Sequence, residues 1–228
     1  LIGKDTRKSG DMLEAALTAG LCSTGAKVIP LGVVPTPAVA YLTRYYKADA
    51  GVVISASHNP CEYNGIKFFN SDGYKLSDGI ENEIESYILG EKAIEELPTH
   101  GKVGYVSANH NAVEDYVAFA VSTIDCRLDG MKIAVDCANG ASYETAFKAL
   151  NKLGANVEAI HNTPDGVNIN HMCGSTHMES LQAYVTSIGA DIGIAFDGDA
   201  DRMLAVDENG KLIDGDQIMA ACAKFMRD

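Results

Sequence analysis

The sequence predicts an α/β protein with two open sandwich domains, each built on a largely parallel sheet covered by helices. Short apolar runs such as Ala-Gly-Val-Val-Ile-Ser at 50–55 are typical of buried strands. A stretch whose apolar residues have helical spacing precedes such a run. This alternation occurs twice along the chain and thins between about 90 and 128. In such folds the binding and catalytic sites lie in loops at the carboxyl ends of the strands.

The first series of elements opens in what reads as the end of a strand. Because the chain starts there and without Met, we expect a further segment upstream. An amphipathic helix follows at 10–25, with Ser9 or Asp11 as its N-cap and Gly25 as its C-terminal stop. The other predicted elements are a β-branched strand at 27–34, a helix at 37–47, strands at 50–55 and 66–70, a turn at Asp72-Gly73, a strand at 74–76 and a helix at 78–89.

A weakly patterned segment at about 90–128 predicts a connection between domains. It carries charged residues together with Pro98, Gly101 and Gly104, and it contains one helix near 113–122. We therefore expect domains at 1–108 and 109–210, with 211–228 beginning a third.

The second series repeats the alternation of strands and helices. We predict strands at 131–135, 155–160, 191–196, 203–206 and 211–213, helices at 143–153, 178–188 and 216–226, and a turn at 207–210.

The composition excludes several classes of protein. The chain has 228 residues, and 18 Lys and Arg against 31 Asp and Glu give a net charge of −13. Nucleic acids and anionic membrane surfaces are therefore poor partners, since both attract basic patches. The sequence shows neither a run of about 18 apolar residues nor a signal peptide. Its six cysteines form no C-x-x-C pair, which argues against a zinc ribbon or a disulfide framework and favours a cytoplasmic location.

The loop Ser55-Ala56-Ser57-His58-Asn59-Pro60 follows the buried strand at 50–55. Small and turn-forming residues let backbone N–H groups converge, which suits phosphate oxygens, and the Ser57 hydroxyl sits in the middle. The alternative is an ordinary turn closed by side-chain to backbone hydrogen bonds, and this loop alone does not decide between them.

The loop Asp197-Gly198-Asp199-Ala200-Asp201-Arg202 follows the strand at 191–196. Three carboxylates so close together repel one another unless a cation lies between them, and oxygen ligands favour Mg²⁺ or Ca²⁺. An EF-hand is opposed by Arg202, which stands where that loop needs glycine, and by flanking strands. A solvated acidic turn remains the other alternative.

Two further side chains are candidates for chemistry. Lys67 lies ten residues after Ser57 on the strand at 66–70, where a lysine commonly points to solvent; facing the loop, it could move the hydroxyl's proton or neutralise a phosphate. His58 adjoins Ser57 and is poorly placed for a Ser-His pair. Because the chain lacks a G-x-S-x-G motif, a serine hydrolase is not indicated.

The Ser55–Pro60 and Asp197–Arg202 loops, together with further segments that occur in the family's order, resemble the bacterial phosphoglucosamine mutase family of the α-D-phosphohexomutase superfamily. The resemblance spans essentially the whole chain and implies domains I and II of that superfamily, two α/β/α sandwiches with mixed, largely parallel sheets. Asn168-Ile169-Asn170 followed by the Cys173–His177 segment is similar to the glucosamine branch in particular. The other matching segments are Gly3-Lys4-Asp5-Thr6-Arg7, Val34-Pro35-Thr36-Pro37, the Ser55–Pro60 loop, Asn64-Gly65-Ile66-Lys67-Phe68, and the Asp197–Arg202 loop with Phe196 before it and Val206-Asp207 after it.

The resemblance implies a reaction and a role for each candidate residue. A phosphorylated Ser57 would give its phosphoryl group to O1 of glucosamine 6-phosphate, form glucosamine 1,6-bisphosphate as intermediate or activator, and recover a phosphoryl group from O6. Glucosamine 1-phosphate, a precursor of UDP-N-acetylglucosamine and so of peptidoglycan, would leave. The implied roles are Mg²⁺ ligation by Ser57, Asp197, Asp199 and Asp201, general acid/base catalysis by Lys67, steadying of the phosphate or metal loop by Arg202 and His58, and support of the Ser57 region by Arg7.

The chain departs from the family by lacking its first arginine-containing segment, its sugar-binding loop in domain III and its phosphate-binding loop in domain IV. We therefore expect little or no mutase activity from these 228 residues alone. A phosphoglucomutase/phosphomannomutase and a non-catalytic module that binds a phosphosugar or Mg²⁺ stay open as alternatives, as does a homodimer.

Overall fold

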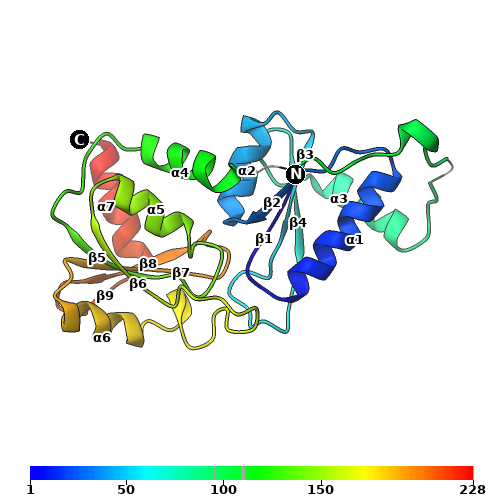
Figure 1. Ribbon diagram of the computed structural model, residues 1–228. Helices are drawn as coiled ribbons and strands as arrows, with labels where there is room; N and C mark the ends of the chain where they lie inside the picture. The colour runs from blue at the N-terminus through cyan, green and yellow to red at the C-terminus, as the bar shows by residue number, and fades with distance from the viewer. Residues whose placement is uncertain (95, 109–110, 228) are drawn as a thin grey trace.

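The computed structural model describes residues 1–94, 96–108 and 111–227 and shows two α/β/α units, each with its own sheet (Figure 1). Both sheets are mixed: their central strands are parallel, and antiparallel strands lie at one edge. The predicted fold class is confirmed. The domain boundaries at 108 and 210 stay a prediction.

The sheet of the first unit has the order β2-β1-β3-β4. Its strands are β1 (Ile2–Lys4), β2 (Pro30–Val33), β3 (Ala50–Ile54) and β4 (Ile66–Asn70), of which only β4 is antiparallel to its neighbour. Successive side chains of β3 point to opposite faces. Val52 and Ile54 pack with α1 (Ser9–Ser23), whereas Val53 packs with α2 (Thr36–Tyr45). Both faces of β3 are thus buried, which explains its continuous apolar run.

Two sequence predictions in this unit are wrong in detail. Tyr74–Leu76 is no strand: only Lys75 forms an isolated bridge, with Phe69. The Asn70 side chain accepts the N–H groups of residues 72 and 74 and closes the turn, after which the chain leaves the sheet for α3 (Asp78–Ile88). The N-cap of α1 is Lys8 rather than Ser9 or Asp11.

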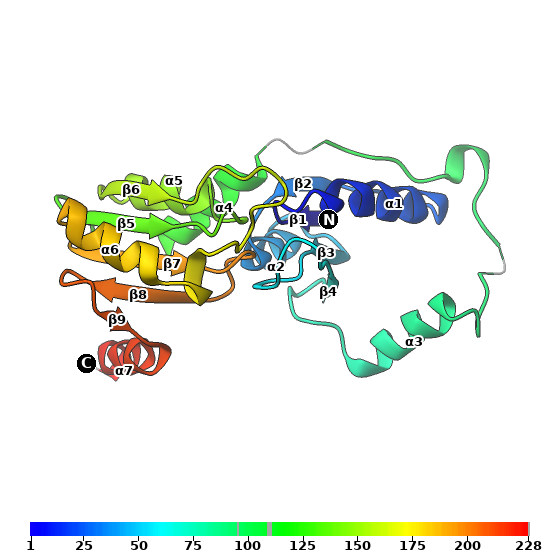
Figure 2. The ribbon, with the colours of Figure 1, turned by 90° about the horizontal axis from the view of Figure 1, so that it is seen from below.

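The connection between the units reaches α4 (Ala112–Ser122) after passing a short 3-10 turn, η1 (His100–Lys102). Figure 2 shows α3 standing away from the first sheet, and none of its residues is buried. Helix α4 packs against both units. Phe119 stacks on Tyr41 of α2 with ring centroids 3.8 Å apart, and Glu114 pairs with two lysines of α5.

The sheet of the second unit has the order β6-β5-β7-β8-β9, and the last two strands run antiparallel to their neighbours. Helices α5 and α6 cover opposite faces, as the cores around Val135 and Ala134 show. The bounds are β5 (Lys132–Asp136), α5 (Thr145–Lys152), β6 (Asn156–Ile160), η2 (Gly174–Thr176), α6 (Glu179–Ile188), β7 (Ile192–Phe196), β8 (Met203–Asp207), β9 (Leu212–Ile213) and α7 (Gly215–Arg227).

This topology positions the candidate site. The loops after β1, β2 and β3 leave the carboxyl ends of parallel strands in the first sheet, and the loop after β7 leaves the equivalent end of the second. Hydrogen bonds join these loops across the boundary between the units. Among the described residues, no helix is both long and apolar enough to span a membrane.

Candidate active site

The loop after β3 presents Ser57 in a left-handed backbone conformation, with φ of 54°. The Ser57 N–H donates to Ser55 Oγ at 2.9 Å, and Ser55 Oγ donates in turn to Asp5 Oδ2 at 2.6 Å. Both Ser55 and Asp5 are buried. A chain of hydrogen bonds that starts at Asp5, the residue after β1, therefore fixes the backbone of Ser57.

Arg7 binds the backbone of the same loop. Its side chain is fully buried and paired with the equally buried Asp5, Nε to Oδ2 2.9 Å. The guanidinium donates to four loop carbonyls, those of Ser57 at 3.1 Å, Asn59 at 2.8 Å, Tyr63 at 2.9 Å and Pro60. Both terminal nitrogens donate into the loop, so Arg7 fixes the loop backbone and is turned away from solvent.

The loop after β7 carries the three carboxylates of the predicted metal site. Asp197 and Asp199 are buried and Asp201 is exposed. A carboxylate oxygen of each lies within 4.8 Å of those of the other two. Burial, and next the charges of Asp199 and Asp197, raise the pKa of Asp201. The three side chains thus form a crowded anionic group at the carboxyl end of β7.

The two loops meet at the Ser57 hydroxyl. Ser57 Oγ donates to Asp197 Oδ2 at 2.7 Å, and Nη2 of Arg202 contacts the same hydroxyl. That nitrogen also lies 2.8 Å from Asp197 Oδ2 and 2.8 Å from Nδ1 of His58. The Ser57 hydroxyl therefore contacts both a carboxylate and a guanidinium, which also contact each other.

Asp199 connects the Asp197–Arg202 loop to the first unit. Its Oδ2 accepts from Thr36 Oγ1 at 2.6 Å and from Lys67 Nζ at 2.8 Å. Burial alone would raise the pKa of Asp199, but the hydrogen bonds from Lys67 and Thr36 outweigh it, so the pKa lies below its usual value. The carboxylate is thus held in its charged form. Its second oxygen, Oδ1, is buried and makes no hydrogen bond.

Gly198 lets the two loops approach closely. A Cβ at this position would lie 2.6 Å from the Ser57 carbonyl oxygen and 2.6 Å from Nδ2 of Asn170, closer than Cβ atoms come to such groups. Asn170 fills the space on the other side and donates from Nδ2 to the carbonyls of Ser57 at 2.8 Å and Asn59 at 3.0 Å. A residue without a side chain is therefore required at 198.

The structure brings most of the predicted site residues together. Seven share one cluster: Ser57, His58, Lys67, Asp197, Asp199, Asp201 and Arg202. Arg7 lies beneath the Ser57 loop. Sequence reasoning gave no site role to Asp5, Thr36 or Asn170, although all three stand in the segments that carried the family resemblance.

Comparison with known proteins agrees with this arrangement. The family model of phosphoglucomutase/phosphomannomutase alpha/beta/alpha domain I matches residues 1–95, and that of domain II matches residues 113–210. The chain belongs to the phosphoglucomutase/phosphomannomutase family. It is a phosphohexomutase homologue whose two matched domains are the two α/β/α units of the structure.

Among curated proteins, this chain is similar to phosphoglucosamine mutases. It is 62% identical to that of Clostridium acetobutylicum over all 228 residues, which cover 51% of the relative. It is 64% identical to that of Acetivibrio thermocellus over 220 residues, which are 96% of this chain and 49% of the relative. The chain thus spans about half the length of the curated relatives it matches.

Solved structures show the same fold. A putative phosphomannomutase from Thermus thermophilus is 25% identical with a TM-score of 0.81, and the match covers 99% of this chain and 52% of that one. A phosphoglucomutase/phosphomannomutase family protein from Burkholderia thailandensis is 28% identical with a TM-score of 0.78 over 93% of this chain and 47% of that one.

Proposed function

We propose that this chain carries the phosphoserine and metal loops of a phosphoglucosamine mutase, which interconverts glucosamine 6-phosphate and glucosamine 1-phosphate. The observation that carries the proposal is the position of Ser57 Oγ, 2.7 Å from Asp197 and in contact with Arg202. A nucleophile in contact with both a carboxylate and a guanidinium suits transfer of a phosphoryl group. The identity to phosphoglucosamine mutases supports the choice of sugar.

The side chains around Ser57 fit a divalent cation. The oxygen atoms of Asp197, Asp199 and Asp201 cluster, and the buried Oδ1 of Asp199 makes no hydrogen bond. Mg²⁺ is the ion such hard oxygen ligands prefer beside a phosphate, and a phosphoserine oxygen would complete the set. Mg²⁺ bound there would neutralise part of the negative charge that develops on the transferred phosphoryl group.

The chain's own residues orient the reaction. Arg202 faces the Ser57 hydroxyl and would hold an oxygen of the phosphoryl group, with His58 beside it. Lys67 is half-exposed and is held at the site by its ion pair with Asp199, and we assign it the role of general acid/base for the sugar hydroxyl. Arg7 and Asn170 hold the loop backbone, so that Ser57 keeps its place while the substrate reorients.

In the proposed cycle, the bond between phosphorus and Ser57 Oγ breaks as O1 of glucosamine 6-phosphate attacks, which gives glucosamine 1,6-bisphosphate. The intermediate then reorients in the site. Ser57 Oγ attacks the phosphoryl group on O6, the bond between that phosphorus and O6 breaks, and glucosamine 1-phosphate leaves. The phosphoserine is regenerated, so the cycle needs no further phosphate donor.

The first experiment tests the phosphoserine. The purified chain is incubated with Mg²⁺ and glucosamine 1,6-bisphosphate, and phosphate is located by intact-mass and peptide mass spectrometry. We expect one phosphoryl group, on Ser57, that is absent from Ser57→Ala and retained in the exposed-site control Ser71→Ala. Phosphate elsewhere, or retained in Ser57→Ala, would refute the assignment.

A second experiment tests the sugar. The full-length gene product is assayed with glucosamine, glucose and mannose 6-phosphates side by side. We expect the highest kcat/KM for the glucosamine substrate. A preference for glucose or mannose would favour a phosphoglucomutase/phosphomannomutase, and binding without turnover of any of them would favour a non-catalytic module. The same assay on the 228-residue chain should give little or no conversion.

A further inference from the structure

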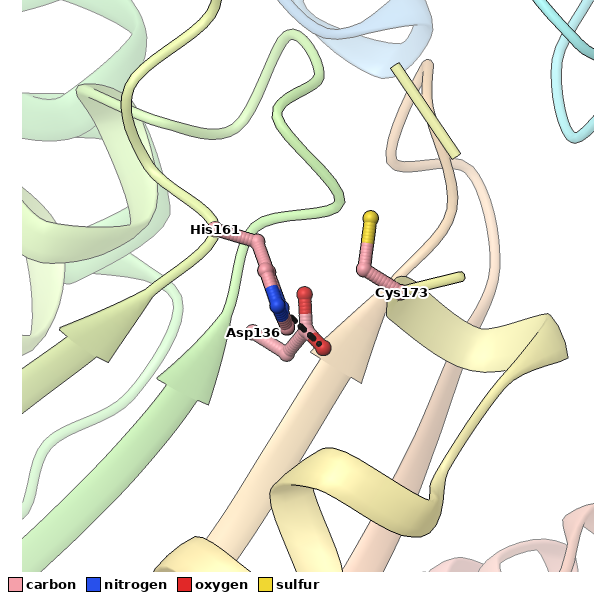
Figure 3. A group of neighbouring side chains, drawn as sticks. All are labelled: Asp136, His161 and Cys173. Atoms are coloured by element: carbon pink, nitrogen blue, oxygen red, sulfur yellow. Dashed lines mark hydrogen bonds and ion pairs between the residues drawn. The ribbon is translucent and has the colours of Figure 1, made fainter. Parts of the chain in front are cut away.

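A second group of metal-ligating side chains lies in the second unit, apart from the Asp197 loop. Asp136 ends β5, His161 directly follows β6, and Cys173 precedes the 3-10 turn η2. Figure 3 shows the His161 imidazole and the Asp136 carboxylate facing each other, with Cys173 beside them. One carboxylate oxygen, one ring nitrogen and the sulfur all lie within 4.8 Å of one another.

The Asp136 carboxylate is fixed in place by the backbone. It is fully buried, Oδ1 accepts the N–H of Ala138 at 2.8 Å, and Oδ2 accepts the N–H of Gly174 at 3.0 Å. The remaining contact of Oδ2 is with Nδ1 of His161 at 2.9 Å. An ion that took the place of the proton between Oδ2 and Nδ1 would leave both backbone hydrogen bonds intact.

The other two ligands differ in access to solvent. Cys173 is fully buried, whereas the His161 side chain is 31% exposed. His161 therefore marks the open side of the group, through which an ion could enter and on which a water could supply a fourth ligand. A buried sulfur, a carboxylate and an accessible imidazole form the kind of three-ligand set that open zinc sites use.

We infer that Asp136, His161 and Cys173 form a binding site for a Zn²⁺-type transition metal ion, separate from the Mg²⁺ loop. Nitrogen and sulfur ligands select Zn²⁺ and its neighbours over Mg²⁺, which takes oxygen ligands. On binding, the Cys173 thiol loses its proton to solvent, and the proton on Nδ1 of His161 leaves or moves to Nε2. One divalent ion with one carboxylate and one thiolate leaves the buried group neutral.

A metal ion bound at this site would act on the active site through the chain segment that contains Asn170. It would join the ends of β5 and β6 to the segment just before η2, and Asn170 stands three residues before Cys173 in that segment. Asn170 holds the carbonyls of Ser57 and Asn59. The ion would therefore restrain the segment that supports the phosphoserine loop, without touching that loop itself.

Co²⁺ is the probe for the test, because its bond to a thiolate gives a near-ultraviolet charge-transfer band. The test is done on a parent variant in which Cys126→Ser and Cys222→Ser remove the two cysteines classed as exposed. With Mg²⁺ present to fill the Asp197 loop, we expect one Co²⁺ per chain, with the charge-transfer band and the intense visible bands of a four-coordinate ion. Excess Mg²⁺ should leave the spectrum unchanged, and Zn²⁺ should abolish it.

Three variants in that background locate the site. Cys173→Ala should remove the charge-transfer band, and His161→Gln, at an accessible position, should weaken Co²⁺ binding by about 100-fold or more, since even changes to the partners of metal ligands cost about 10–100-fold. Cys61→Ser, a half-buried thiol outside the group, should bind Co²⁺ as the parent does. Absence of the charge-transfer band in the parent, its persistence in Cys173→Ala, or unchanged affinity in His161→Gln would overturn the inference.

Discussion

Replacing Arg7 by alanine should destabilise the first unit by about 3–5 kcal/mol, the usual cost of removing one partner of a buried ion pair. Both Arg7 and Asp5 are fully buried, so the variant leaves a carboxylate without its cation. Four loop carbonyls also lose their donor. These losses do not add in full, because the loop residues Asn59 and Glu62 are exposed and the loop can open to water.

The assay is urea unfolding of the purified chain, with thermal unfolding as a second measure. For a protein of this size about 3–5 kcal/mol corresponds to roughly 6–20 °C in Tm. Arg44→Ala, at an exposed arginine of α2, is the matched control and should change the stability by less than about 0.5 kcal/mol. Limited proteolysis should cut Arg7→Ala faster between residues 57 and 63.

A pH series adds an independent signature. Burial raises the pKa of Asp5, against the opposing hydrogen bonds from Ser55 and Arg7. Without the guanidinium that pKa rises further, so the variant gains stability relative to the wild type as the pH falls and Asp5 takes up a proton. A loss below about 1 kcal/mol at pH 7, or a deficit that grows toward low pH, would refute the role of Arg7 as the buried support of the loop.

Three more predictions follow from the site and its surroundings. Gly198→Ala should lower the free energy of unfolding in urea by about 1–3 kcal/mol, because its Cβ would meet Ser57 and Asn170. The control Gly79→Ala, which has open space in α3, should raise that free energy by about 0.5–1 kcal/mol. Equal effects of the two substitutions would contradict the close approach of the loops at Gly198. Asp199→Asn should weaken Mg²⁺ binding by roughly 10-fold or more in calorimetry, while Asp72→Asn should not, and unchanged affinity would remove Asp199 from the ligand set. The hydrogen bond from His161 to the Asp136 carboxylate raises the pKa of His161. In metal-free buffer, the stability that His161 adds relative to His161→Gln should therefore be full below about pH 6.5 and lost as the pH rises through the folded pKa. A stability difference that grows with pH would have the wrong sign.

Much of the fold and two of the loops could be predicted from local sequence. The apolar runs of β3 and β7 identify buried strands, so Ser57 and Asp197 could be placed at strand ends. Lys67 could not be placed from its strand alone, because a lysine in an edge strand commonly faces solvent. Its contact with Asp199 joins residues that are 132 positions apart in the sequence. The local sequence around Lys67 therefore does not indicate this contact.

The supporting residues were harder to predict for the same reason. Thr36 reaches Asp199 across 163 residues, and Asn170 reaches Ser57 across 113. Both side chains would serve equally well in ordinary turns, so their roles depend on how the two units pack. In the segment expected as a strand at 74–76, the Tyr74 N–H bonds to the Asn70 side chain and only Lys75 forms a bridge.

The charges around Ser57 lead to a final prediction about the order of binding. Asp197, Asp199 and Asp201 face Lys67 and Arg202, which leaves a small excess of negative charge when Ser57 is unmodified. A phosphoryl group attached to the Ser57 oxygen adds a charge of about −1.5 to −2. That oxygen lies 2.7 Å from Asp197 Oδ2 in the unmodified chain. The cation site and the phosphoserine should therefore stabilise each other.

Calorimetry on the phosphorylated and unphosphorylated chain measures this coupling directly. We expect tighter Mg²⁺ binding by the phosphorylated form, by roughly 5–150-fold, and by reciprocity a larger phosphorylated fraction at equilibrium with the sugar bisphosphate when Mg²⁺ is bound. Ser57→Ala is the control, since its affinity should match the unphosphorylated chain. Equal Mg²⁺ affinity in both forms would show that the ion and the phosphoryl group occupy separate places, and the proposed ligand set would then be wrong.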